Sequence, residues 1–381
     1  MKRMAVVALS VVATTAVHAQ SSVTLYGLID AGLMYTNNVV KGASHGSLFQ
    51  ATSGEINGSR FGLRGSEDLG GGLHAIFVLE NGFNLQNGKL AQNSRLFGRQ
   101  AYVGLKSDEF GTLTLGRQYD FITDFIAPLS GVSGTLGDTG FAHPFDNDNY
   151  DHSFRINNAL KYSSVDYHGF RFGGMYAFSN NQNFANNRAY SVGAIYSKGP
   201  LNIAAAYLQL NGSNSTTGTA GAIDTAESAS NGIGGFQLGA DVQRTAAAAI
   251  NYAYGPAVIG FAYSHSQFQN TLSFGSNNGT VRFDNYDLSV KYALTHAVSL
   301  GGSYTYTDGH VTQSTTFGAD PKWNQVNLQA VYSFSKRTDV YAEGMYQHVS
   351  GHGFVAYING SGGASSTANQ VVGTVGMRTR F

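Results

Sequence analysis

The sequence predicts an all-β protein, specifically a 16-stranded antiparallel transmembrane β-barrel. The first observation is an alternation of polar and apolar residues with period two, which recurs in segments of about ten residues. The second is that the links between these segments are short and long in turn. The third is composition, because only 12% of the 381 residues are charged while Gly (49), Tyr (22) and Phe (24) are abundant.

The composition also excludes several other classes of protein. The mean hydropathy is −0.14, and no uninterrupted apolar run reaches the roughly 18 residues that a membrane-spanning helix needs. Glycine lacks a three-residue period, which excludes collagen, and an aromatic content of 12% argues against disorder. Lys+Arg and Asp+Glu both number 23, so we expect no nucleic-acid partner. The absence of cysteine excludes disulfides, zinc–thiolate centres and a thiol nucleophile.

Residues 1–19 have the pattern of a secretory signal peptide. Lys2 and Arg3 form a positive start, a short apolar stretch follows, and a small-x-small site ends at Ala19. We expect cleavage at this point and export of the rest. No composition shift divides the remainder, so residues 20–381 are predicted to form a single barrel domain.

The alternation is clearest towards the C-terminus. One face of a predicted strand carries Val326, Leu328, Ala330, Tyr332 and Phe334, and the other Asn327, Gln329, Val331, Ser333 and Ser335. Neighbouring strands place Asp287, Lys291 and Glu343 on the polar face, while the apolar faces end in tyrosines. A soluble sandwich is the alternative, but its packed core explains neither feature. A membrane barrel explains both, with interfacial aromatics outside and a polar lumen.

The connections support the same interpretation. Short links occupy 198–200, 254–256, 294–296 and 335–337, and long ones 211–241, 267–280, 308–323 and 350–370. We count about sixteen strands between Ser22 and Phe381. Short turns at one end and long loops at the other are typical of outer-membrane barrels.

Several strings resemble those of the Gram-negative general-diffusion porins of the betaproteobacterial and neisserial type. The strings are Ser22–Asp30, Ser59–Gly70, Arg99–Leu105, Gly111–Gln118 and Val375–Phe381. The resemblance implies a homotrimer in the outer membrane, in contact with lipid and lipopolysaccharide, that passes small hydrophilic solutes without a cofactor. It also implies that the terminal aromatic, Phe381, is read by the barrel-assembly machinery.

A barrel of sixteen strands encloses a lumen too wide for side chains to fill. The segment from Asp120 to Asn157 follows the fifth strand and matches by position the third loop of the family, which bends into the barrel. Phe121, Phe125 and Leu129 supply apolar anchors, so we expect the loop to be ordered. The short turns are then expected at the periplasmic end and the other long loops outside the cell.

The resemblance implies a constriction between this loop and an arginine cluster on the wall. The residues expected there are Arg60, Arg64, Arg99 and Arg155 on the wall and Asp120 and Asp124 on the loop. Arg64 is included because it lies four residues after Arg60 in the same predicted strand and should therefore face the same side. Enterobacterial relatives carry an acidic residue directly after the loop's proline, where this chain has Leu129. Because a ring of arginines favours anions, we expect a weakly anion-selective channel.

Several alternatives remain open. The arginines could pair with Asp124, Asp138 and Glu80 and only hold the loop in place. The channel could instead be substrate-selective, for which the lumen-facing parity of Tyr341 is a faint sign. An outer-membrane hydrolase would need a catalytic elbow, whereas the G-x-S-x-G string at 42–46 falls in a predicted polar loop. We therefore expect no enzyme activity.

One acidic cluster is a weak candidate for a metal site. Its oxygen ligands would come from Asp146, Asp148 and Asp151. The segment lacks the glycine and the final glutamate of an EF-hand, so a solvated loop is the alternative interpretation.

Overall fold

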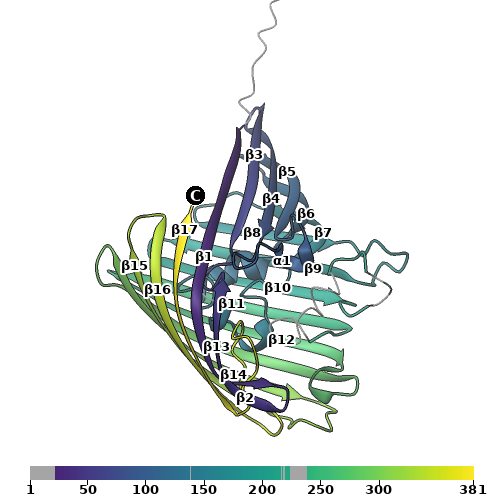
Figure 1. The fold of residues 1–381 in the computed structure, drawn as a ribbon. Helices are drawn as coiled ribbons and strands as arrows, with labels where there is room; N and C mark the ends of the chain where they lie inside the picture. The colour runs from purple at the N-terminus through teal and green to yellow at the C-terminus, as the bar shows by residue number, and fades with distance from the viewer. Residues whose placement is uncertain (1–21, 138, 216, 218, 224–237) are drawn as a thin grey trace, which may run out of the picture.

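The computed structural model describes residues 22–137, 139–215, 217, 219–223 and 238–381. The expected signal peptide, residues 1–19, and Asp138 lie outside the described residues. The described strands form one closed antiparallel sheet, in which the N-terminal and C-terminal strands lie side by side (Figure 1). The predicted 16-stranded barrel is confirmed.

The seventeen described strands occupy sixteen strand positions around the barrel. The long strand β1 (Ser22–Lys41) pairs along one edge with β17 (Asn369–Arg380). Its other edge pairs first with β3 (Arg60–Gly70) and then with β2 (Ser44–Ser53). Strands β2 and β3 therefore occupy one strand position of the barrel, which is interrupted at residues 54–59.

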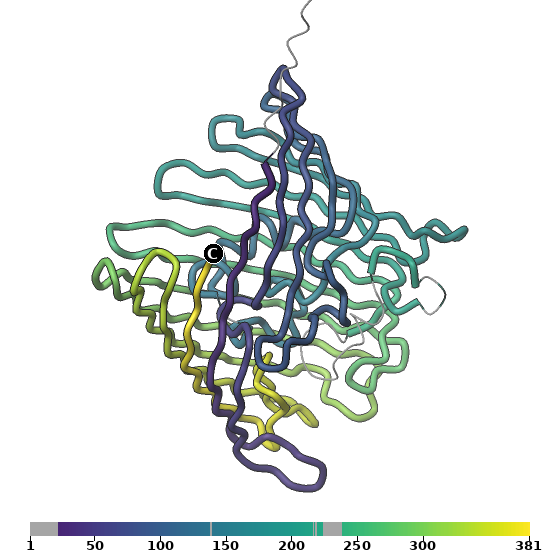
Figure 2. The backbone as a smooth tube through the Cα atoms, turned by 45° about the horizontal axis from the view of Figure 1, so that its top comes forward, coloured from purple at the N-terminus to yellow at the C-terminus, as the bar shows by residue number. Residues whose placement is uncertain are grey.

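The remaining strands follow in chain order around the barrel, each hydrogen-bonded to the next (Figure 2). They are β4 (Leu73–Gly82), β5 (Gln100–Ser107), β6 (Gly111–Gln118), β7 (Ile156–Ser163), β8 (Phe170–Ala177), β9 (Arg188–Lys198), β10 (Leu201–Asn211), β11 (Val242–Tyr254), β12 (Ala257–Thr271), β13 (Gly279–Ala293), β14 (Val298–Val311), β15 (Lys322–Ser333) and β16 (Thr338–Ser350).

The two ends of the barrel differ in the length of their connections. At one end, called here the short-turn end, strands are joined by links such as 199–200, 255–256 and 334–337. The long-loop end carries 83–99, 119–155, 212–241 and 351–368. The predicted loop at 267–280 is shorter than expected and spans only 272–278, because β12 and β13 continue their ladder beyond the alternating core.

The alternation predicted for β15 is present in the wall. Val326, Leu328 and Tyr332 are exposed on the outer face, and Leu328 is 61% exposed. Asn327 and Gln329 are buried on the inner face. The apolar side of the strand therefore faces outward and the polar side faces the lumen, as in a membrane barrel.

Aromatic residues project from the outer face of the barrel wall. The exposed members include Tyr252, Tyr254, Tyr286, Tyr292, Tyr304, Tyr332, Phe334 and Tyr346. Exposed tyrosine rings on the outer wall are typical of membrane barrels, where they lie at the interfaces between lipid and water. Among the described residues, no helix has both the length and the apolar character needed to cross a membrane.

The loop from 119 to 155, called here the inner loop, packs inside the barrel. It contains four short helical segments, η1 (Ile122–Ile126), η2 (Ala127–Leu129), η3 (Thr139–Phe141) and η4 (Pro144–Asp146). Elsewhere, α1 (Ala91–Ser94) and η5 (Ser273–Gly275) are short turns in other loops. The inner loop buries its apolar side chains against small residues of the inner wall, including Ala204, Ala206, Ala247, Ala249 and Ala262.

Close approach between the inner loop and the wall requires glycine at two positions. A Cβ atom on Gly173 would lie 2.2 Å from Cζ of Phe121. A Cβ atom on Gly193 would lie 2.8 Å from Cβ of Phe121 and 3.0 Å from Cδ2 of Phe125. The wall of β8 and β9 is therefore shaped to receive the start of the loop.

Polar contacts hold the rest of the inner loop. The backbone N–H of Gly131 donates to Asp287 on β13 at 2.8 Å. The Gln325 amide on β15 donates to the carbonyl of Gly140 at 2.7 Å. These contacts attach the loop to the wall opposite β3 and β5.

The loops at the long-loop end gather around the single tryptophan of the chain. Trp323 is 2% exposed and packs edge-on to Phe145 of the inner loop and to Phe354 of the loop before β17. This aromatic cluster covers one side of the mouth and joins the inner loop to the outer ones.

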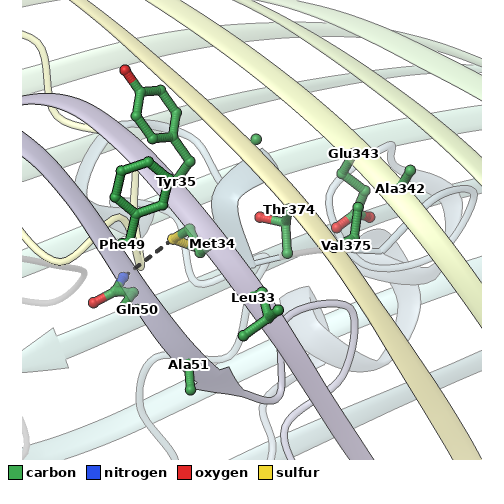
Figure 3. A pocket seen from close by; sticks show the side chains of 11 residues that line it. Leu33, Met34, Tyr35, Phe49, Gln50, Ala51, Ala342, Glu343, Thr374 and Val375 are labelled. Atoms are coloured by element: carbon green, nitrogen blue, oxygen red, sulfur yellow. Dashed lines mark hydrogen bonds between the residues drawn. The ribbon is translucent and has the colours of Figure 1, made fainter.

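The outer face carries a hollow of about 590 Å³ where β1, β2, β16 and β17 meet (Figure 3). Leu33, Tyr35, Phe49 and Val375 surround it, and small residues form its floor. Met34 and Gln50 belong to the other face of the same strands, where the Gln50 amide donates to the Met34 sulfur at 3.2 Å. The closing seam of the barrel is thus apolar on its outer surface.

Candidate functional site

A polar cavity of about 360 Å³ lies between the inner loop and the wall made by β3 and the start of β5. We call it the loop–wall gap. Its lining residues are Ile56, Asn57, Gly58, Arg60, Gln92, Arg99, Ser133, Thr139, Asp151, His152, Ser153 and Arg155. The structure thus brings together three of the four predicted arginines.

Arg99 is the arginine that is neutralised. It immediately precedes β5, and its Nε donates to Oε1 of Glu80 at 2.7 Å. The other oxygen of that carboxylate accepts a hydrogen bond from the Tyr26 hydroxyl at 3.0 Å. Because both groups are buried, this ion pair fixes the arginine in one position on the wall. Part of the alternative interpretation, that arginines here pair with Glu80, therefore holds for Arg99.

Arg60 and Arg155 have no carboxylate partner in the part of the chain that the structure describes. The Arg155 guanidinium lies 5.3 Å from the centroid of the Tyr119 ring, and its Nη2 donates to the Tyr119 hydroxyl at 3.4 Å. The side chain of Arg60 makes no hydrogen bond or ion pair with a described residue. Two positive charges therefore border the gap without a paired anion among these residues.

The two titratable loop residues in the gap add little charge at neutral pH. Burial, together with Arg99 and Arg155, lowers the pKa of His152 to about 3, so the imidazole is neutral. Burial and the neighbouring Asp146 carboxylate raise the pKa of Asp151, which favours its neutral form. The electrostatic character of the gap is therefore set by its arginines.

The acidic residues predicted for the constriction have other partners. Asp120 is buried, and its Oδ1 accepts the backbone N–H of Ile122 at 2.7 Å while its Oδ2 accepts the Asn149 amide at 2.8 Å. The prediction that Asp120 faces the constriction is wrong, because its carboxylate closes the first turn of the loop. Asp124 forms an ion pair with Lys161 on β7 and does not line the gap.

Arg64 is also absent from the gap. Its guanidinium is exposed and lies 5.4 Å from the centroid of the Tyr26 ring. Four residues along a strand correspond to about 13 Å, which carries this side chain from the level of Arg60 towards the short-turn end. This position is compatible with the prediction that Arg64 faces the same side of the strand as Arg60. It is not compatible with the prediction that Arg64 lies in the constriction.

Sequence reasoning did not find Lys161. Its ammonium contacts Asp124 and donates to the carbonyl of Tyr119 at 2.7 Å. The signal was available in the alternation of β7, where exposed Leu160 is flanked by buried Ala159 and Lys161. That alternation places Lys161 on the inner face, where it holds the beginning of the inner loop.

The weak metal candidate has other contacts. Asp148 is hydrogen-bonded to His143 Nδ1 at 2.7 Å and to the Ser264 hydroxyl. Asp146 accepts the backbone N–H groups of Asp151 and Ser153, both at 3.0 Å. Within the described ranges, no group of three or more His, Asp or Glu residues is arranged to hold a metal ion. These carboxylates instead bind donors that fix the inner loop.

The serine of the G-x-S-x-G string lies in a hairpin. Ser44 begins β2 directly after the turn at 42–43, and its hydroxyl donates to the carbonyl of Lys41 at 3.1 Å. The prediction that this string lies in a polar loop is wrong, because Val40 pairs with His45 in a β-ladder. The strand-turn-helix geometry of a nucleophile elbow is not formed there.

A closed barrel with a polar inner face, narrowed by its own loop, is the architecture of a membrane channel. A sequence model described as Gram-negative porin matches residues 5–352. An outer membrane porin protein of Bordetella pertussis is 36% identical over 359 residues, which cover 87% of this chain and 90% of that protein. The chain belongs to the Gram-negative porin family.

Other comparisons agree with this assignment. The major outer membrane protein P.IB of Neisseria meningitidis serogroup B is 31% identical over 187 residues, covering 48% of this chain and 52% of that one. The anion-selective porin from Comamonas acidovorans shares the fold, with a TM-score of 0.73 and 23% identity over 95% of this chain and 100% of its own. The predicted family is confirmed. The protein is a passive channel in the outer membrane of a Gram-negative bacterium.

Proposed function

We propose that this porin is a weakly anion-selective general-diffusion channel and that the loop–wall gap is its selectivity zone. The observation that carries the proposal is Arg60, which borders the gap without an ion-pair partner in the described chain. Unpaired cations in a narrow aqueous passage attract anions and repel cations. Small hydrophilic solutes would pass through the same opening by diffusion.

Two features of the inner loop support a positive balance. Asp124, the acidic residue expected opposite the arginines, is paired with Lys161 instead. Leu129 stands where enterobacterial relatives are expected to have an acidic residue, and it is buried in the apolar core of the loop. A structural relative from Comamonas acidovorans is described as anion-selective, which adds support.

The test is the zero-current potential of the purified protein in a planar bilayer that separates two concentrations of potassium chloride. The expected sign is that of chloride preference, at a modest magnitude because Arg99 is neutralised by Glu80. A potential of the cation-selective sign would overturn the proposal. A current that saturates with one solute would favour the alternative of a substrate-selective channel.

We propose that the channel is a homotrimer with its short-turn end in the periplasm. A tilted strand needs about 9–11 residues to cross a bilayer, whereas β5, β6, β7 and β8 have eight each. Contact with another protomer on this side would shield the shorter wall from lipid. An outer membrane protein of Vibrio cholerae with the same fold is described in a trimer form. Three equal closing steps in single-channel records are the expected sign.

The remaining partners follow from this placement. We infer that the signal peptide is removed after Ala19 and that residues 20–381 form the mature barrel. The outer aromatic rings would contact lipid, with lipopolysaccharide around the long-loop end. Phe381 would present its ring to the barrel-assembly machinery. Transport would need no cofactor and no catalysis, so replacing Ser44 should change no hydrolytic activity.

A further inference from the structure

A second lumenal cavity, of about 540 Å³, lies on the other side of the tip of the inner loop. Leu136 of that tip forms one boundary, and the rest of the lining comes from β13 to β17 and their short turns. The lining residues are Leu136, Lys291, His296, Ser299, Gln329, Val331, Ser333, Ser335, Lys336, Asp339, Arg378 and Arg380. We call it the vestibule site.

The vestibule site has two lysines, two arginines and one carboxylate. Arg378 binds Asp339 through two hydrogen bonds, of 3.2 Å from Nε and 3.1 Å from Nη2. Arg380 shares the same carboxylate, with Nη1 at 2.9 Å from its Oδ2. Two guanidinium groups therefore bind Asp339, and their two positive charges exceed its single negative charge.

The two lysines of the site have no ion-pair partner in the described part of the chain. Lys291 projects from β13 on the inner face, and Lys336 stands in the turn between β15 and β16. The hydroxyl-bearing residues Ser299 and Ser333 lie between them on the lining. Gathering like charges in one concave site is unfavourable unless an anion compensates them.

We propose that the vestibule site binds small polyvalent oxyanions, such as inorganic phosphate and dicarboxylates, in series with the loop–wall gap. Ammonium groups supply point charge, and guanidinium groups present donors in a planar array that matches phosphate and carboxylate oxygens. A polyvalent anion gains attraction from each cation at once, whereas chloride gains less. The proposal rests on the proposed function, because the ligand must reach the site through an anion-permeable lumen.

The ligand is a solute and not a lipid headgroup, since the site opens into the lumen. Lys291 follows the inward parity of Asp287 and Ser289, which are buried inside the barrel. Leu136 also ties the site to the inner loop, because a Cβ atom on Gly301 would lie 2.2 Å from its Cδ2. Anions that leave the gap past this loop tip would meet the lysines next.

The test records chloride current through the full mature channel while inorganic phosphate is added from the short-turn side at constant ionic strength. Phosphate is expected to reduce the chloride current of the wild type with saturation. In the double variant Lys291→Gln, Lys336→Gln, the half-inhibiting concentration is expected to rise roughly fivefold or more, since two charges facing a polyvalent anion are removed. Neither lysine is in an ion pair of the described chain, so folding should be preserved.

Arg337→Gln is the matched control. Arg337 is exposed in the same turn as Lys336, but its side chain does not line the site. The control should therefore retain the phosphate inhibition of the wild type. If the double variant behaves as the control does, or if the wild type shows no inhibition, the vestibule site is refuted while chloride preference leaves the proposed function intact. A cation-selective wild type would instead overturn the proposed function itself.

Discussion

At the scale of single residues, the three arginines of the loop–wall gap differ in what surrounds them. Arg99 is bound to Glu80, whereas Arg60 forms no ion pair or hydrogen bond with a described residue. Arg60→Gln should therefore lower the chloride-to-potassium permeability ratio, by roughly two- to threefold for the loss of one unit charge a few ångströms from the ion path. Zero-current potentials in a salt gradient measure this ratio.

Arg64→Gln provides the matched control for that variant. It removes the same charge from the same strand, but its side chain lies outside the gap. Its effect on the permeability ratio should be clearly smaller. Equal effects of the two variants would mean that selectivity reflects the whole lumen and not the gap.

Asp151 makes the selectivity dependent on pH. Burial and Asp146 raise the pKa of this carboxyl, while Arg155 and Arg99 act in the opposite direction. Below the raised pKa the group is neutral, and above it the carboxylate cancels part of the arginine charge. Chloride preference should therefore fall as pH rises from about 6 to about 9. Asp151→Asn should remove this dependence, and a dependence that survives the substitution would refute the assignment.

The resemblance to the family assigned Arg60, Arg99 and Arg155 to the constriction, and all three line the loop–wall gap. Alternation alone could not place Arg99 or Arg155, because each precedes its strand. Asp120 and Asp124 could not be placed in this way. Their partners, Asn149 and Lys161, are 29 and 37 positions away in the chain, and only the folded loop brings them together.

At the scale of elements, the inner loop depends on the absence of side chains on the wall it covers. Gly173→Val should push Phe121 from the wall, since a Cβ atom at this position would already lie 2.2 Å from its ring. Overpacking of this kind costs about 1–3 kcal/mol. We expect a displaced loop, with larger and noisier single-channel conductance than the wild type.

Gly174→Val is the control for the element-scale prediction. Gly174 is the next residue of β8 and points outward, and a Cβ atom there would meet nothing within 4 Å. Its conductance should match that of the wild type. If the two variants are indistinguishable, the packing of Phe121 against Gly173 does not position the loop.

The elements were predictable because a barrel strand repeats one simple pattern. The alternation identified β13, β14, β15 and β16 with their outer faces correctly assigned. Two details escaped the pattern. The break at 54–59 separates β2 from β3, and it involves buried polar contacts such as that between the Asp30 N–H and the Ser59 hydroxyl at 3.1 Å. The extended end of β13 reverses the pattern, because Val281 and Phe283 are buried on the inner face while Arg282 is exposed on the outer face.

At the scale of the whole molecule, the barrel is closed by its two ends. Gly27 and Phe381 exchange both backbone hydrogen bonds at 3.0 Å, which completes the seam between β1 and β17. A Cβ atom on Gly27 would lie 2.5 Å from Cζ of the Phe381 ring and 2.6 Å from the backbone carbonyl oxygen of Arg60. The terminal ring thus occupies the space that the glycine leaves open.

Gly27→Val should therefore weaken closure. Since every strand of the barrel depends on the seam, the barrel should unfold at a lower temperature. Overpacking should lower the free energy of unfolding by about 1–3 kcal/mol. The shift in electrophoretic mobility on heating measures unfolding, and the fluorescence of Trp323, buried in the mouth, reports the same event independently. Gly373→Val on β17 is the control, because a Cβ atom there meets nothing within 4 Å. Equal stability of the two variants would show that the close approach of Phe381 and of the Arg60 backbone to Gly27 does not limit closure.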